Sequence, residues 1–224
     1  MNIEPISSML QMFVVQRPLD ANLAVAVSDI SNRAEFYEIA GTGLSTLCQT
    51  IAQQHIKAGL NTRVTNVSTT TLSDILRQFA PSEIHFLKID VEGAEDLVLR
   101  GAGFDRFRPW IVLVEATHPT TQQSSREGWE EILLNAEYDF AYFDGLNRFY
   151  VAKEHSEPSK LIAVPPNVSD DFVLVDHIEA EQSLEALRLS TSWRLTAPLR
   201  KAKAIFRVLR DKIRQVVCYG IMME

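Results

Sequence analysis

The sequence has few of the features that mark secreted, metal-binding or membrane proteins. It contains two cysteines among 224 residues, and Cys48 and Cys218 stand too far apart to form a metal-binding pair, which favours a reducing compartment. Its longest apolar runs, such as residues 111–114, have the length of a β-strand and are too short to span a bilayer. The N-terminal residues lack the basic and apolar regions of a signal peptide. We therefore expect a cytoplasmic globular protein.

Negative charge dominates most of the chain, while one C-terminal segment is basic. The formal net charge is −7. Residues 188–214 contain nine Lys or Arg and one acid, a local charge of +8, and Glu224 adds −1, so residues 1–187 carry −14. The acidic body argues against nucleic acid as a partner, because phosphate binding needs a basic face.

Short apolar runs alternate with amphipathic stretches along the middle of the chain, which is typical of an α/β protein with a parallel sheet. Nearly continuous apolar character predicts buried strands at residues 23–27, 84–89 and 111–114. Helical spacing predicts helices at residues 44–58, 72–79, 93–99 and 127–136. Thr71 or Ser73 is expected to cap the second of these helices.

The end of this region has a different pattern. Aromatic residues at 140–143 and 148–151 flank a glycine-containing turn, which predicts an antiparallel hairpin. Several prolines predict a loop over residues 153–176, and the chain is expected to be helical from about residue 180, with a break near Pro198. We therefore divide the chain into a domain over residues 1–178 and a helical tail over residues 179–224.

Carboxylates follow the predicted strands. Ligands bind beyond the carboxyl ends of the strands in an open parallel sheet, so these positions are candidates for a site. A row of acceptors suits a ligand rich in hydroxyl and amine donors, such as a nucleoside, or a hard cation. The candidate carboxylates are Glu4, Asp29, Asp90, Glu92 and Glu115.

One motif resembles a known family. Residues 86–95 read FLKIDVEGAE and residues 98–101 read VLRG, which resembles the signature of FkbM-type methyltransferases that use S-adenosylmethionine (SAM). Three flanking segments agree with it, namely residues 3–5 (IEP), 26–29 (AVSD) and 70–74 (TTLSD). The resemblance covers about residues 1–175. It implies a Rossmann-like methyltransferase sheet, mostly parallel with a C-terminal antiparallel hairpin, and methylation of a hydroxyl group of a sugar, a glycan or another small molecule.

The resemblance also implies roles for individual residues. Glu4 would accept hydrogen bonds from the SAM ribose, Asp29 would lie near the adenine, and Asp90 and Glu92 would lie near the methyl group and the acceptor. His118, just beyond the strand at 111–114, is our candidate for the base that takes the acceptor proton, with Asp90 second. We expect no metal; a divalent ion held by Asp90, Glu92, Glu115 and His118 is the alternative.

The family pattern begins with a strand and a glycine-rich loop that this sequence lacks, so the first strand of the sheet is expected to be missing. Residues 41–43 (GTG) come after the third strand of the pattern and do not replace that loop. Either Met1 is an internal methionine of a longer protein, or the gene product is truncated. In the second case two neighbouring strands would expose unpaired edges, and we expect weak SAM binding or none.

The tail carries a second, shorter resemblance. Residues 190–200 (STSWRLTAPLR) resemble a segment near the ends of bacterial glycosyltransferases and other enzymes of polysaccharide synthesis. Beyond Pro198 the spacing predicts a basic amphipathic helix. Such a helix either contacts the inner face of the membrane or a glycosyltransferase, or packs on the acidic body of the same chain. A catalytically inactive interaction module in polysaccharide biosynthesis is therefore the alternative function.

Overall fold

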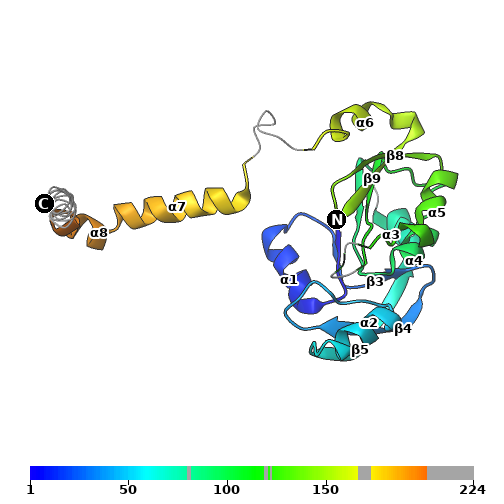
Figure 1. Ribbon diagram of the computed structural model, residues 1–224, viewed down its shortest axis with the longest axis horizontal. Coiled ribbons are helices and arrows are strands. Elements are labelled where there is room, and N and C mark those ends of the chain that lie inside the picture. The colour runs from blue at the N-terminus through cyan, green and yellow to red at the C-terminus, as the bar shows by residue number, and fades with distance from the viewer. Residues whose placement is uncertain (80–81, 119–120, 122, 166–172, 201–224) are drawn as a thin grey trace, which may run out of the picture. The chain divides into compact units, whose positions relative to one another are not determined.

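The computed structural model describes residues 1–79, 82–118, 121, 123–165 and 173–200 (Figure 1). The chain divides into two units, Met1–Pro165 and Pro166–Glu224. The first unit is a mixture of helices and sheets. The described part of the second unit contains α7 (Val175–Leu189) and α8 (Thr191–Leu195). No helix within the described ranges combines the length and the apolar character that crossing a bilayer requires.

A four-stranded sheet forms the centre of the first unit. Its strand order is β6 (Phe86–Ile89), β7 (Ile111–Glu115), β9 (Asn147–Ala152) and β8 (Tyr138–Phe143). β6 and β7 are parallel, with Ile89 opposite Val114. β9 runs antiparallel to both β7 and β8, so the hairpin predicted from the aromatic residues is confirmed.

Two smaller sheets accompany it. In the first, β1 (Asn2–Ile3) pairs in parallel with β2 (Asn22–Leu23). In the second, β5 (Thr62–Thr71) lies between β3 (Ala26–Ser28), to which it is parallel, and β4 (Asn32–Ile39), to which it is antiparallel. The single strand predicted at residues 23–27 is therefore wrong, because its two halves belong to different sheets.

The expectation of a mostly parallel sheet also needs correction, since three of the six strand pairings described are antiparallel. The sequence gives little sign of β4 and β5, the longest antiparallel pair. β5 reads TRVTNVSTTT and is mostly polar. Its stability comes from eight paired positions on β4, which no local pattern contains.

Most predicted helices are present with altered bounds. They are α2 (Gln49–Lys57), α3 (Leu72–Phe79), α4 (Glu95–Arg100) and α5 (Glu130–Asn135), the last preceded by the 3₁₀ turn η1 (Arg126–Gly128). α2 begins later than expected because Thr46 pairs with Tyr37 of β4. Thr71 caps α3, since its Oγ1 accepts a hydrogen bond from the Asp74 amide at 3.0 Å.

Three further helical elements were not predicted. α1 (Ser7–Gln16) follows β1. The expected loop over residues 153–176 instead contains the 3₁₀ turn η2 (Lys153–His155) and α6 (Glu157–Ile162), and α7 already begins at Val175. Pro158 lies in the first turn of α6, where proline is compatible with a helix. The basic helix predicted over residues 202–217 lies outside the described residues.

The main core lies where α3, α4 and α5 pack against the four-stranded sheet. The Tyr138 hydroxyl donates a 2.8 Å hydrogen bond to the Pro109 carbonyl, so this buried ring keeps its polar end satisfied. The core fixes β6 and β7 and therefore the residues at their ends. Its largest fully buried apolar side chains include Leu99, Val112, Val114, Leu133, Tyr138 and Tyr150.

β1 and β6 are edge strands of two different sheets. Among the described strands, β1 pairs only with β2 and β6 pairs only with β7. Phe86, on β6, is 52% exposed. Each of the two strands therefore has one edge without a strand partner among the described residues.

Candidate functional site

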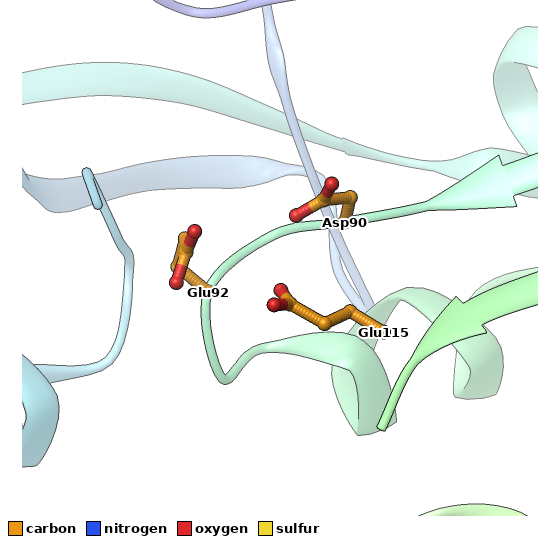
Figure 2. A group of neighbouring side chains, drawn as sticks. All are labelled: Asp90, Glu92 and Glu115. Carbon is orange, nitrogen blue, oxygen red and sulfur yellow. The ribbon is translucent and has the colours of Figure 1, made fainter. Parts of the chain in front are cut away.

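Three carboxylates meet at one end of the four-stranded sheet. Asp90 follows β6, Glu115 is the last residue of β7, and Glu92 lies on the turn after Asp90. Because β6 and β7 are parallel neighbours, their carboxyl ends share one edge. Each side chain has a carboxylate oxygen within 4.8 Å of one from each of the others, and Figure 2 shows the three groups facing a common space. We call these residues the carboxylate cluster.

An unusual turn holds Glu92 in the cluster. Glu92 has φ +53° and Gly93 has φ +92°, so two successive residues adopt left-handed backbone conformations. The Glu92 carbonyl accepts a 2.8 Å hydrogen bond from Thr46 Oγ1, and the Gly93 amide donates one of 3.0 Å to Glu95 Oε1. These bonds offset the cost of the turn.

Burial and mutual repulsion raise the pKa values of two members of the cluster. Glu115 is 8% exposed, and its burial, followed by repulsion from Asp90 and Glu92, raises its pKa to about 8. Burial, followed by repulsion from Asp90 and Glu95, raises the pKa of Glu92 to about 7. The nearby cation Lys88 pairs with Asp90 at 2.8 Å but is half exposed. The cluster is therefore poised to hold or release a proton near neutral pH.

A cavity of about 120 Å³ borders the cluster. Asp90 and Glu92 line it together with Glu4, which follows β1. Glu4 Oε1 accepts a 2.7 Å hydrogen bond from the Ile6 amide, and burial raises the pKa of Glu4. The structure thus brings together three of the four residues predicted to bind the cofactor.

The fourth residue, Asp29, does not line this cavity. It is exposed at the end of β3 and accepts a hydrogen bond from Ser28 Oγ at 3.2 Å. The chain leaves the β1–β2 sheet after Leu23 and joins the second sheet at Ala26, so Glu4 and Asp29 follow strands of different sheets. Its contact with adenine stays a prediction.

His118 belongs to a different part of the site. It is exposed in the segment that follows β7 and is not a member of the carboxylate cluster. It lines a second cavity, of about 470 Å³, which also borders Gly93 and Glu95. The four-residue metal site considered from the sequence is thus reduced to its three carboxylates.

Sequence reasoning undervalued two features. Glu115 was recognised as a carboxylate at a strand end, but its burial depends on contacts from distant segments, so its raised pKa had no local signal. Thr42 and Gly43 were set aside as wrongly placed for a glycine-rich loop, yet both line the cavity beside Glu4. A turn that stands at another place in the sequence than the family's glycine-rich loop can still border the same cavity in the folded chain.

Comparison with known proteins gives one match. The model of the methyltransferase FkbM domain matches residues 2–142, which include Glu4, Asp90, Glu92 and Glu115. No curated protein and no solved structure matches the chain.

Proposed function

The chain belongs to the FkbM methyltransferase family, and on that basis we propose that it methylates a hydroxyl oxygen of a sugar, a glycan or another small molecule. As a member of this family it is a methyltransferase, and its cofactor is SAM. The observation that carries the proposal is the carboxylate cluster at the ends of β6 and β7, bordering the same cavity as Glu4.

The residues around the first cavity fit one part of SAM. The Glu4 carboxylate can accept hydrogen bonds from ribose hydroxyls, and Asp90 and Glu92 offer negative charge to a sulfonium. The volume of about 120 Å³ is below the roughly 300–1,000 Å³ of ordinary small-molecule sites. The described residues therefore supply part of a SAM site, so we expect residues 1–224 to bind SAM weakly or not at all.

The proton of the acceptor needs a base. SAM supplies an activated methyl group, so the enzyme has to position the hydroxyl and take its proton as the oxygen–carbon bond forms and the sulfur–carbon bond breaks. His118 is our candidate, since it follows β7 and borders the second cavity. Asp90 is the second candidate, since it lies in the carboxylate cluster.

A divalent ion is an alternative way to orient the acceptor oxygen. The observation in its favour is the cluster itself, because three carboxylate oxygens within 4.8 Å of one another form a hard-ligand set. Methyl transfer that is unchanged by EDTA would support proton transfer without a metal. Activity that disappears with EDTA and returns with Mg²⁺ would support the ion.

A non-catalytic role in polysaccharide assembly is the second candidate function. It rests on residues 190–200, of which α8 forms part. Ser190 Oγ accepts a 3.2 Å hydrogen bond from the Trp193 amide, and the Arg200 guanidinium lies 3.8 Å from the Trp193 ring centre. The segment is therefore a capped, ordered unit that could contact a glycosyltransferase or the cytoplasmic face of a membrane. This role predicts binding to such a partner without methyl transfer.

Calorimetric titration of S-adenosylhomocysteine tests the leading proposal. The titration is made into residues 1–224 and into a chain extended by any in-frame residues encoded upstream. We expect one site per chain in the extended protein if those residues add a strand and a glycine turn, and weak binding or none in residues 1–224. Glu4→Gln should weaken that binding, while Glu83→Gln, an exposed carboxylate outside the cavity, should not. Absence of heat from both folded chains would contradict SAM binding at this site.

A further inference from the structure

Thr46 is a fully buried polar residue that contacts the turn of the carboxylate cluster. Its side chain is 0% exposed. Thr46 Oγ1 donates a 2.8 Å hydrogen bond to the Glu92 carbonyl and accepts one of 2.8 Å from the Cys48 amide, at the start of α2. The Thr46 backbone pairs with Tyr37 of β4 through hydrogen bonds of 2.9 and 3.1 Å. This one residue therefore joins the Glu92 turn to both β4 and α2.

The segment that contains Thr46 also forms part of the wall of the first cavity. Its two neighbours, Ser45 and Leu47, both line that cavity. Successive side chains of extended backbone point to opposite sides, so Thr46 points away from the cavity while its neighbours face it. One stretch of chain thus contacts the first cavity on one side and the Glu92 turn on the other.

The turn depends on such contacts because its backbone conformation is unfavourable. Glu92 has φ +53°, a left-handed value that is costly for a residue with a side chain. Gly93 packs closely on α2, since a Cβ added there would lie 2.0 Å from Ile51 Cδ1. The backbone conformation of a residue sets the direction of its Cα–Cβ bond. A change in φ at Glu92 would therefore move its carboxylate relative to Asp90 and Glu115.

From these contacts we infer that Thr46 is a positioning residue for methyl transfer. Its hydrogen bond to the Glu92 carbonyl keeps Glu92 in the left-handed conformation that places its carboxylate in the cluster. The same segment thereby aligns a wall of the first cavity with the carboxylate that faces the sulfonium. The assignment rests on the proposed function, in which Glu92 offers negative charge to the sulfonium of SAM.

The backbone conformation of Glu92 provides the first test, and it needs no ligand. Valine has the shape of threonine without the hydroxyl, so Thr46→Val removes both side-chain hydrogen bonds. The ¹³Cα and ¹³Cβ chemical shifts of Glu92 report its φ in residues 1–224. We expect these shifts to leave the left-handed range in Thr46→Val and to stay there in Thr46→Ser, which keeps the hydroxyl. Valine places a methyl group where the hydroxyl was, so Thr46→Ala is the second variant if the valine chain does not fold.

Thr69 provides a matched control. It is 6% exposed, and its Oγ1 donates a 3.0 Å hydrogen bond to the Ile30 carbonyl and accepts one of 3.0 Å from the Asn32 amide. Thr69→Val therefore removes the same two kinds of bond at a position that lines neither cavity. The Glu92 shifts should stay in place in this variant. The inference is overturned if Thr46→Val leaves these shifts unchanged, or if Thr69→Val moves them as far.

The relative affinities of SAM and S-adenosylhomocysteine provide the second test. Only SAM carries the positive sulfonium, so the ratio of the two affinities reports the carboxylates beside the sulfur, whereas a general loss of stability weakens both ligands alike. We expect Thr46→Val to lower the preference for SAM about fivefold or more, and Thr46→Ser and Thr69→Val to keep it within about twofold. Equal weakening of both ligands in Thr46→Val would overturn the inference. If the wild type binds neither ligand, the proposed function fails, and the Glu92 shifts alone decide whether Thr46 positions Glu92.

Discussion

Replacement of Glu115 by glutamine is expected to make the protein more stable at alkaline pH. Burial and the neighbouring charges raise the pKa of this carboxyl from an ordinary 4.5 to about 8. Because the pKa of this carboxyl is raised in the folded protein, Glu115 loses its proton at a lower pH in the unfolded chain than in the folded one. The contribution of Glu115 to stability therefore falls as the pH rises from about 4.5 to about 8, and glutamine, which stays neutral, removes this fall.

The size of the effect follows from the shift. Between pH 5.5 and pH 8 the Glu115 carboxyl is mostly ionised in the unfolded chain and mostly protonated in the folded one, an interval of about 2.5 pH units. Each pH unit in this interval corresponds to about 1.4 kcal/mol of unfolding free energy. Between pH 5.5 and pH 8.5 the wild-type chain should thus lose roughly 3 kcal/mol of unfolding free energy relative to Glu115→Gln. Urea denaturation followed by circular dichroism at the two pH values measures this difference.

The control is Glu131→Gln, which neutralises an exposed glutamate on α5. It should follow the wild-type pH dependence. The reasoning is refuted if Glu115→Gln loses as much stability as the wild type between the two pH values, or if it loses more. Either result would mean that ionisation of Glu115 does not lower the unfolding free energy of the protein.

Two further predictions concern the turn and the core. Gly93→Ala would force a side chain to φ +92° and bring its Cβ to 2.0 Å from Ile51 Cδ1, so we expect a loss of roughly 2–5 kcal/mol in urea denaturation. A variant as stable as the wild type would show that this turn can relax. Leu133→Ala removes a side chain with 0% exposure and should cost about 2–5 kcal/mol in the same assay. A cost below about 1 kcal/mol would mean that α5 does not pack tightly on the sheet.

The sequence by itself determined the elements whose signal is local. Residues 72–79 carry a helical pattern after a threonine cap, and the apolar runs at residues 84–89 and 111–114 predict the strands found at 86–89 and 111–115. When two such strands are parallel neighbours, the residues that follow them lie at the same edge of the sheet. Asp90 and Glu115 could therefore be expected to meet before any coordinates were known.

Only the tertiary structure decided features that depend on distant segments. The chain changes sheets between Leu23 and Ala26, so Glu4 and Asp29 follow strands of different sheets, because strand pairing is a choice between partners far apart in sequence. The burial that raises the pKa of Glu115 likewise comes from packing on several elements.

The cavities depend on the same long-range contacts. His118 follows β7 in sequence, as Asp90 follows β6, yet it borders a different cavity because the turn at Glu92 and Gly93 lies between the two spaces. A residue's position in the sequence fixes the end of the sheet that it reaches. The side chains around it there, and therefore its charge and its ligand, are set by packing.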